Sequence, residues 1–351
     1  MREFGSEFEI EHLPDGYFSG LALKTAYSAF TRSGREAIGL ALEGIPAGTA
    51  LLPAYSCWSM SLPFEAAGWR VDYYPLKPDL IVDIPKLQEL IKELSPKAVL
   101  VMDYFGFAPT CDAVKAVRNA DTGILLIEDF TQCLFSIGDK WNDEVDCYVA
   151  SIRKSIGVPD GGVILSKKPL KTEALSEAQT EFVSCHIEAG RTKKLYMYSA
   201  DIADKEAFRA AQAKAGEIIK ADYKLYKISS TALGILNNTD AETVRSARRL
   251  NYEHLYQLIK DNKYIDVMFQ PAGNSAPFMM IVKSHQRDLL QAELAKKGLY
   301  CQLLWPLSEK ARTVCPVARE MEETMLAIPI DQRYDYYDIE EMGRRINEVV
   351  L

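Results

Sequence analysis

Histidine and clustered cysteine are both scarce in this sequence of 351 residues. The chain has four histidines and seven cysteines, and they are dispersed without a CxxC pair or a mixed His/Cys cluster. A zinc site draws its ligands from such clusters, so we do not expect one here. Scattered cysteines in odd number also argue against a disulfide framework, and we expect reduced thiols in a cytoplasmic protein.

Excess positive charge is missing as well. The 41 Lys and Arg residues are outnumbered by 49 Asp and Glu residues, which gives a formal net charge of -8. A surface that follows nucleic-acid phosphates needs clustered Lys and Arg, and the sequence has no such block. The start, MREFGSEFEI, has no apolar signal core, and no apolar run approaches membrane-spanning length. We therefore expect neither a nucleic-acid partner nor a membrane partner.

Between residues 33 and 166, by contrast, helix and strand signals alternate. The strand signals are short apolar runs at TALLPAY, WRVDYYPL, KAVLVMDYFG, GILLIEDF, DCYVAS and GGVILS. Continuous apolar strands separated by helices are typical of a mostly parallel sheet that is covered on both faces. The predicted fold class of this region is α/β.

The rest of the chain predicts a second, smaller lobe. Residues 167–225 are polar and helix-rich, and a long helical pattern begins near residue 241. The segments PFMMIVKS, QRDLLQAELAKKG, LYCQLLWPL and YDIEEMGRRINEVV then predict strand, helix, strand and helix. We predict an N-terminal arm at 1–30, a large domain at 31–240 and a small α+β domain at 241–351.

Residues with useful chemistry fall at the predicted strand ends. Ligands of such sheets bind beyond the carboxyl ends of the strands, and Tyr55, Tyr104, Asp129 and Lys154 all lie there. The patterns GxGxxG, GxxxxGK[ST], HExxH and GxSxG are absent, so a dinucleotide site, a P-loop, a zinc protease and a nucleophile elbow have no support. A lysine, a carboxylate and small polar residues remain.

Lys154 and Asp129 each have a chemical and a structural interpretation. A lysine captures carbonyl groups when desolvation or a cationic neighbour such as Arg153 lowers its pKa; otherwise Lys154 is a solvated turn residue. Asp129 is placed to pair with a protonated pyridine nitrogen, but it equally suits a turn or helix cap. Gln132, three residues later, would fit a capping box.

The segment RSGREAI has the same ambiguity. Small residues at the start of a helix leave backbone N–H groups and a positive dipole end, which suit a phosphate group. Ser33 would otherwise be an ordinary helix cap.

Taken together, these segments resemble the DegT/DnrJ-type aminotransferases, a fold-type I family that uses pyridoxal 5'-phosphate (PLP) and often acts on nucleotide-linked keto sugars. The resemblance covers about residues 30–166 and resumes more faintly toward the C-terminus. Five segments are similar to family motifs in the same order: SGREAIGLAL, LLPAYSCWSMSLPFEAAGWRVDYYPL, VMDYFGF, LLIEDFTQ and SIRKSIGVPDGGVILS. Lys154 follows Asp129 by 25 residues, about the family's distance.

The resemblance implies a PLP-transferase fold of type I and specific roles for the residues of the site. Lys154 would bind PLP covalently and move the substrate proton, Asp129 would hold the pyridinium proton, and Gln132 would bind the ring hydroxyl. Trp58 would stack on the ring, with Cys57 or Tyr55 in that place if the register is shifted. The phosphate would be bound by Ser151, Gly34, Arg35 and the amides near Glu36. The implied partners are an amino donor, a keto acceptor and a second subunit in a homodimer.

Two segments depart from the family pattern. YKISSTALGILNN stands where the family brings an Asn from the partner subunit, and Ser229 or Ser230 would have to substitute for it. LLWPL replaces a His-Tyr-Pro-like stretch near the C-terminus. Arg333 would bind a substrate carboxylate or be a solvated loop residue. These departures concern substrate recognition and leave the acceptor open.

Three functions follow from this reasoning. The first is a PLP-dependent aminotransferase that moves an amino group from an amino acid to a keto acceptor, including nucleotide-linked keto sugars. The second is another fold-type I reaction, namely decarboxylation, elimination or condensation. The third is a non-catalytic protein of the same fold with a binding or regulatory role.

Overall fold

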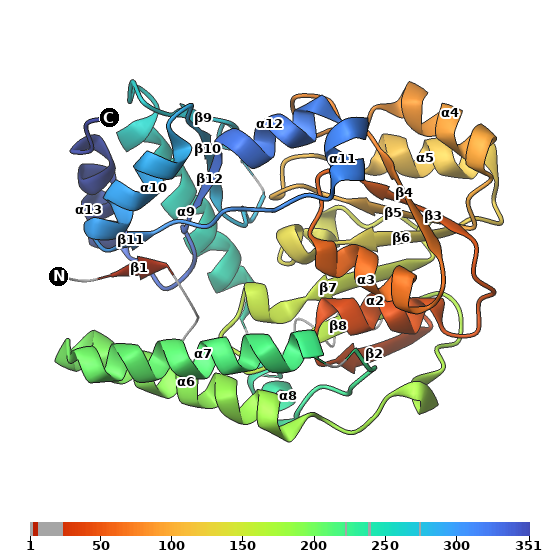
Figure 1. The fold of residues 1–351 in the computed structure, drawn as a ribbon, viewed down its shortest axis with the longest axis horizontal. Helices are drawn as coiled ribbons and strands as arrows, with labels where there is room; N and C mark the ends of the chain where they lie inside the picture. The colour runs from red at the N-terminus through yellow and green to blue at the C-terminus, as the bar shows by residue number, and fades with distance from the viewer. Residues whose placement is uncertain (1–2, 6–23, 222, 238–239, 274) are drawn as a thin grey trace.

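The computed structural model describes residues 3–5, 24–221, 223–237, 240–273 and 275–351. A seven-stranded sheet forms the centre of the larger lobe (Figure 1). In sheet order its strands are β2 (Tyr27–Thr31), β8 (Gly162–Ser166), β7 (Cys147–Ser151), β6 (Leu125–Asp129), β5 (Ala98–Met102), β3 (Thr49–Pro53) and β4 (Arg70–Tyr74). The strands from β4 to β7 pair in parallel, and β8 is antiparallel to both of its neighbours. This confirms the predicted α/β class with a mostly parallel sheet.

Helices lie between these strands, as the alternating pattern predicts. They are α2 (Gly34–Leu42), α3 (Trp58–Ala66), α4 (Ile84–Leu94) and α5 (Cys111–Ala120). Asp83 caps α4 by accepting a hydrogen bond from the backbone N–H of Lys86. Strands β5 to β8 are buried at every residue, so the sheet is covered on both faces, as their continuous apolar runs predict.

The smaller lobe combines short strands with helices. Its three-stranded antiparallel sheet has the order β12 (Met325–Ile328), β10 (Met280–Lys283) and β9 (Asp266–Val267). A parallel pair joins β1 (Phe4–Gly5) to β11 (Leu299–Tyr300). The helices are α9 (Ala241–Ile259), α10 (Arg287–Lys296), α11 (Glu309–Val314), α12 (Pro316–Thr324) and α13 (Tyr336–Asn347), and α9 packs against α13.

The predicted strand LYCQLLWPL is shorter than expected. Only Leu299 and Tyr300 are in β11. The chain then crosses toward the larger lobe, where the carbonyl oxygen of Leu304 accepts a hydrogen bond from the hydroxyl of Tyr55. The apolar run therefore predicts a longer strand than the structure has: Cys301, Trp305 and Leu307 are buried, but the chain between them is not part of a strand and Leu303 is 39% exposed.

Residues 167–225 form mainly a helical hairpin, which the sequence suggested only as helix-rich. Helices α6 (Thr180–Ser199) and α7 (Ile202–Ala221) pack against each other and extend along the lower edge of both lobes in Figure 1. At its base, the buried guanidinium of Arg32 donates to the side chain of Gln179 and lies against the rings of Phe182 and Tyr226. The short helix α8 (Ser230–Leu236) follows.

The predicted domain limits remain a prediction, and two observations concern the proposed N-terminal arm. Tyr27–Thr31 is an edge strand of the large sheet, so the proposed arm at 1–30 overlaps that sheet; the half-exposed strand has no apolar run to reveal it. Residues 6–23 of that arm lie outside the described residues. Among the described helices, none is both long enough and apolar enough to cross a membrane.

Candidate active site

One small cavity lies where β6 and β7 end and α2 begins. Five of the residues proposed from the sequence line it together: Gly34, Arg35, Asp129, Ser151 and Lys154. The rest of the lining was not among the proposed site residues and consists of Ser33, Ile38, Ser59, Met60, Thr131, Arg153 and, from the hairpin, Ile219. The fold thus brings distant segments to one sheet edge, as expected for such sheets.

Asp129 is the last residue of β6 and is almost completely buried. Its Oδ1 atom accepts a hydrogen bond of 2.8 Å from the backbone N–H of Thr131. Burial raises the pKa of the Asp129 carboxyl, while hydrogen bonds from Thr131 and the positive charge of Lys154 act in the opposite direction. The carboxylate therefore has both a turn contact and an electrostatic partner in Lys154.

Lys154 ends a short 3-10 turn, Ile152–Lys154, directly after β7, and its side chain is exposed in the single chain. The next residue is fixed from the smaller lobe. The carbonyl oxygen of Ser155 accepts hydrogen bonds from Arg248 at 3.2 Å and from Gln332 at 3.0 Å. The lysine turn is thus attached to both lobes.

Arg248 and Gln332 were not selected from the sequence. Arg248 is a buried cation on α9, and it also donates to the carbonyl oxygens of Pro277 and Phe278. Burial lowers its pKa to about 10. In the sequence, Arg248 is recognisable only as a charged residue on the inward-packing face of a long helical pattern. Arginine is usually exposed, so this position does not indicate a buried role.

The start of α2 does not use Ser33 as a side-chain cap. Ser33 is extended and makes no capping hydrogen bond; its hydroxyl donates to the carboxylate of Glu36 instead. A Cβ atom at Gly34 would lie 3.0 Å from the backbone nitrogen of Ser151. Glycine therefore allows the helix to begin directly against the end of β7, and the cap interpretation of Ser33 is wrong.

Glu36 points away from the cavity. Its fully buried carboxylate pairs with Arg32, whose Nε lies 2.9 Å from Oε1. Only the backbone near Glu36 is left to face a ligand, in line with the prediction that amides rather than side chains act there. The first-turn amides remain a predicted phosphate site.

Arg35 lines the cavity and contacts Trp58. Arg35 donates through Nη1 to the carbonyl oxygen of Ile219 at 2.9 Å, and its guanidinium lies 5.1 Å from the centre of the Trp58 ring. Trp58 is 46% exposed and does not line the cavity, and neither Cys57 nor Tyr55 does. With Arg35 in this position the cavity volume is about 80 Å³.

Gln132 and the two tyrosines serve other contacts. The Oε1 atom of buried Gln132 accepts from the backbone N–H of Phe105 at 2.9 Å, so no capping box is formed. The hydroxyl of Tyr104 donates to the carbonyl oxygen of Tyr55, and Tyr55 reaches Leu304 of the smaller lobe. Tyr55 thus connects the end of β3 to the smaller lobe, and none of the three side chains lines the cavity.

Ser229 and Arg333 also have partners within the chain. The hydroxyl of Ser229 donates to Asp160 at 2.6 Å. Arg333 forms two hydrogen bonds to Asp331, at 2.6 and 2.8 Å, and is not a solvated residue. Both side chains are therefore held by a carboxylate of the same chain.

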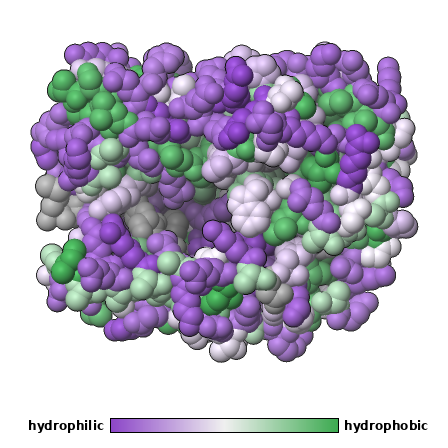
Figure 2. All heavy atoms as spheres, in the orientation of Figure 1, coloured by the Kyte–Doolittle hydropathy of each residue, from purple (hydrophilic) through white to green (hydrophobic). Residues whose placement is uncertain are grey.

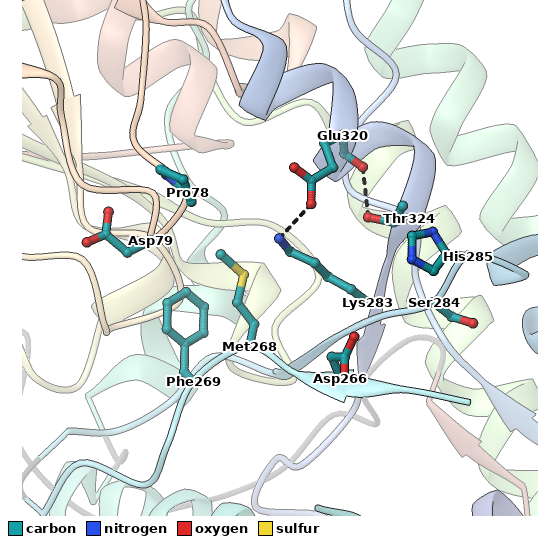
Figure 3. A pocket seen from close by; sticks show the side chains of 10 residues that line it. All are labelled: Pro78, Asp79, Asp266, Met268, Phe269, Lys283, Ser284, His285, Glu320 and Thr324. Carbon is teal, nitrogen blue, oxygen red and sulfur yellow. Dashed lines mark hydrogen bonds and ion pairs between the residues drawn. The ribbon is translucent and has the colours of Figure 1, made fainter. Parts of the chain in front are cut away.

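A larger cavity of about 470 Å³ lies elsewhere, between the turn after β4 and the smaller lobe (Figure 3). Its lining residues are Pro78, Asp79, Asp266, Met268, Phe269, Lys283, Ser284, His285, Glu320 and Thr324. Lys283 points across it to an ion pair with Glu320 at 2.9 Å. Neither Lys154 nor Asp129 lines this cavity, so size alone does not identify the active site.

Across the described residues, no group of three His, Cys, Asp or Glu side chains is arranged to hold a metal ion.

Comparison with protein sequences finds limited similarity. No family model matches the chain. A curated relative, serine hydroxymethyltransferase of Thermococcus gammatolerans, is 31% identical over 128 residues. The match covers 34% of this chain and 30% of that relative, so it spans less than a third of the relative's length.

Comparison with solved structures shows the fold. A DegT/DnrJ/EryC1/StrS aminotransferase of Brucella abortus has a TM-score of 0.65 at 18% identity, covering 94% of this chain and 87% of its own. PseC of Helicobacter pylori, an aminotransferase in pseudoaminic acid biosynthesis, has a TM-score of 0.66 at 14% identity, with 99% and 98% covered. DesV of S. venezuelae, solved with a ketimine intermediate, has a TM-score of 0.64 at 16% identity, with 96% and 90% covered. The chain therefore has the fold of these aminotransferases, with both lobes included.

Proposed function

We propose that this chain is a PLP-dependent aminotransferase of the DegT/DnrJ type that moves an amino group from an amino acid to a keto acceptor. The observation that carries the proposal is that Lys154 and the buried Asp129 line one cavity, together with the start of α2. The fold shared with solved aminotransferases supports it. Other solved neighbours are named sugar aminotransferases, which favours a keto sugar as the acceptor, and the sequence resemblance to the family extends this to nucleotide-linked keto sugars.

The chemistry of the lining residues suits PLP. The cavity offers an amine at Lys154, a buried carboxylate at Asp129 and, at its other end, the first turn of α2 beside Ser151. These groups match an aldehyde, a pyridine nitrogen and a phosphate. Room for the cofactor requires Arg35 to leave the carbonyl oxygen of Ile219, to which it now donates.

Each of these residues has a distinct task in the proposed enzyme. Bound PLP would supply an electron-withdrawing ring that stabilises negative charge on a substrate carbon. Asp129 would keep a proton on the ring nitrogen, because a buried carboxylate in a site of low dielectric interacts strongly with that cation. The Nζ atom of Lys154 would hold the cofactor and then move a proton between substrate and cofactor carbons. Ser151 and the α2 amides would bind the phosphate.

The proposal includes a homodimer and a cytoplasmic location. Lys154, which lines the cavity, is exposed in the single chain, and Trp58 beside Arg35 is 46% exposed, which leaves surface for a second subunit to cover. All seven cysteines are unpaired, which supports a reducing compartment.

A different PLP reaction is the second candidate, because the curated relative is named a serine hydroxymethyltransferase. Addition of amino donors to the PLP-loaded protein separates the two. An aminotransferase converts bound PLP to its amine form, with loss of visible absorbance, whereas a reaction at the substrate's Cα–Cβ bond leaves the aldehyde form in place.

Substitution of Lys154 tests the proposal directly. The wild-type protein should absorb visible light with PLP, and borohydride should fix the cofactor to a peptide containing Lys154. Lys154→Ala should lose this attachment and about 10²–10⁴-fold of the activity, the usual cost of removing a general base. The exposed Lys167→Ala should behave as wild type. Labelling of another lysine, with Lys154→Ala fully active, would overturn the assignment.

A further inference from the structure

One carbonyl oxygen of the lysine turn is bound by two side chains of the smaller lobe. The carbonyl oxygen of Ser155, the residue after Lys154, accepts from Nη2 of Arg248 at 3.2 Å and from Nε2 of Gln332 at 3.0 Å. Ser155 is 2% exposed, so this oxygen is shielded from water. A buried acceptor that loses a partner is costly, and the turn is therefore tightly coupled to the smaller lobe at this point.

The same peptide unit is fixed at its other end. The N–H of Ile156 donates to the carbonyl oxygen of Ile152 at 3.2 Å, and the N–H of Ser155 donates to that oxygen at 2.9 Å. The peptide between Ser155 and Ile156 is planar, so contacts at its oxygen and at its N–H together fix its orientation. The Cα atom of Lys154 lies one peptide, about 3.8 Å, from that of Ser155. A shift at Ser155 therefore moves the base of the lysine side chain.

Arg248 binds acceptors from three separate segments. Its Nε atom donates to Oε1 of Gln332 at 3.1 Å, and its Nη1 atom donates to the carbonyl oxygens of Pro277 and Phe278 at 3.3 and 3.0 Å. With the bond to Ser155, the planar fork of arginine serves four acceptors at once, which the single nitrogen of a lysine cannot do. Arg248 thereby also holds Gln332 in the position from which it reaches Ser155.

The segment before β10 connects Arg248 to the strand ends of the larger lobe. The N–H of Phe278 donates to the carbonyl oxygen of Phe105 at 3.2 Å, and the N–H of Phe105 donates to Gln132 at 2.9 Å. In Figure 2 the surface is hollowed between the hairpin and the lobe above it, so packing between the lobes is not continuous on this face. Individual hydrogen bonds between the lobes therefore contribute more to their alignment.

We infer that Arg248 and Gln332 are positioning residues for Lys154, which they place from the smaller lobe through the peptide that follows it. This inference rests on the proposed function. Neither side chain lines the Lys154 cavity, so neither is placed to touch the reacting atoms. Their effect is on geometry: a misplacement of about 1 Å costs on the order of 10²-fold in rate, and it leaves the groups that bind PLP and substrate unchanged.

Gln332→Glu separates positioning from stability. The new carboxylate keeps an oxygen for Nε of Arg248 and forms a charge-assisted contact with it, but it has no N–H for Ser155 and places negative charge opposite that carbonyl oxygen. Gln291→Glu is the matched control. Gln291, like Gln332, is a half-buried glutamine of the smaller lobe whose Nε2 atom donates at 3.0 Å to a carbonyl oxygen, in its case that of Cys301.

Hydrogen exchange of the apoprotein is the first measurement. In Gln332→Glu the amides of Ser155 and Ile156 should exchange about tenfold faster than in wild type, because the turn loses the hydrogen bond that restrains it. The thermal midpoint should stay close to that of wild type, since the contact with Arg248 is kept. Gln291→Glu should exchange as wild type at both amides.

Steady-state kinetics of the PLP-loaded protein is the second measurement. In Gln332→Glu, kcat should fall about 10–100-fold, while KM and the affinity for PLP stay unchanged. Arg248→Lys keeps the charge but loses the fork, and it should shift kcat in the same way. Its control is Arg345→Lys: Arg345 is also a buried arginine, and it donates to the carbonyl oxygen of Lys297 at 2.8 Å.

Wild-type exchange at Ser155 and Ile156 in Gln332→Glu, or a wild-type kcat in Gln332→Glu or Arg248→Lys, would overturn the inference. Gln332→Met removes the same N–H without adding a charge, so it decides the question by the same criteria where one of the charged variants does not fold.

The exchange measurement needs neither PLP nor substrate, so it separates this inference from the proposed function. Faster exchange in Gln332→Glu, with a wild-type protein that does not bind PLP, refutes the aminotransferase and confirms that Gln332 holds the turn. A wild-type protein that converts PLP to its amine form, with Gln332→Glu equal to it in exchange and kcat, does the reverse.

Discussion

At the scale of single residues, Glu128 shows how burial changes the chemistry of a side chain. It precedes Asp129 on β6 and is 1% exposed. Its Oε1 atom accepts from the hydroxyl of Thr110 at 2.8 Å, while Oε2 has no hydrogen-bond partner among the described residues. Burial raises the pKa of this carboxyl to about 8. The folded protein therefore holds a proton here that the unfolded chain releases near pH 4.5.

This proton predicts a loss of stability as pH rises. Between about pH 4.5 and pH 8 the folded state binds more protons at Glu128 than the unfolded state, so the free energy of unfolding falls by up to about 1.4 kcal/mol per pH unit from this group. Glu128→Gln removes the effect. In urea unfolding of the apoprotein, the free energy of unfolding of Glu128→Gln relative to that of wild type should increase from pH 6 to pH 8. The exposed Glu65→Gln serves as the control, and an equal offset at both pH values for Glu128→Gln would contradict the prediction.

Asp129 allows its turn contact to be separated from its charge. Asn keeps the oxygen that accepts from the Thr131 N–H but removes the negative charge, whereas Ala removes both. We expect Asp129→Asn to keep a thermal midpoint near that of wild type and to lose about 10²–10³-fold in turnover, the usual effect of removing one stabilising group. Asp129→Ala should lose turnover and in addition about 1 kcal/mol of stability. Full activity of Asp129→Asn would show that Asp129 is only a turn residue.

At the scale of elements, the glycine pair after the lysine turn explains how α2 is placed. Gly161 has a φ of 152°, which L side chains rarely adopt, and a Cβ atom at Gly162 would lie 2.3 Å from the carbonyl carbon and oxygen of Ser33. The neighbouring atoms belong to the backbone, so they cannot rotate away. The close approach of β8 to the start of α2 thus depends on Gly162.

Gly162→Ala should therefore displace the turn at Ser33 and Gly34. Overpacking of this kind costs about 1–3 kcal/mol, and we also expect weaker PLP binding because the proposed phosphate site at the start of α2 moves. Thermal unfolding and an absorbance titration with PLP measure the two effects. Gly216→Ala on α7 is the control: nothing lies within 4 Å of its added Cβ, and Ala in a helix should stabilise by about 0.5–1 kcal/mol. A Gly162→Ala protein that binds PLP as tightly as wild type would refute the close-approach argument.

At the scale of the whole molecule, large apolar side chains remain uncovered at the far end of the hairpin. Leu195, Tyr198 and Ile202 are 43%, 83% and 64% exposed. Exposed apolar clusters of this kind are typical of association surfaces. The tip is nevertheless fixed to the smaller lobe, because Lys205 pairs with Glu3 and lies 3.0 Å from the hydroxyl of Tyr300.

We predict a homodimer in solution with an interface above about 2,000 Å², the scale of obligate dimers. Light scattering of the PLP-loaded protein should give about twice the chain mass of 39.4 kDa. Dilution should not separate the subunits in the micromolar range. A monomer that is fully loaded with PLP and fully active would refute the prediction.

The sequence by itself determined the layer order and the sheet edge that carries the site. Continuous apolar runs made the buried strands recognisable, and the ends of those runs located Asp129 and Lys154. It also located the start of α2 through SGREAI. These features are local: periodicity and turn chemistry act over a few residues, so they can be recognised without knowledge of the fold.

Only the tertiary structure decided which side chains meet. The contact of Arg248 and Gln332 with Ser155 joins residues separated by 93 and 177 positions, and no local pattern encodes it. The same holds for α7, whose Ile219 enters the Lys154 cavity while Arg209 and Gln212 line a second one. The sequence of a polar helix does not specify which surface the helix packs against. Its position is set by packing against both lobes, which depends on all of the contacting surfaces together.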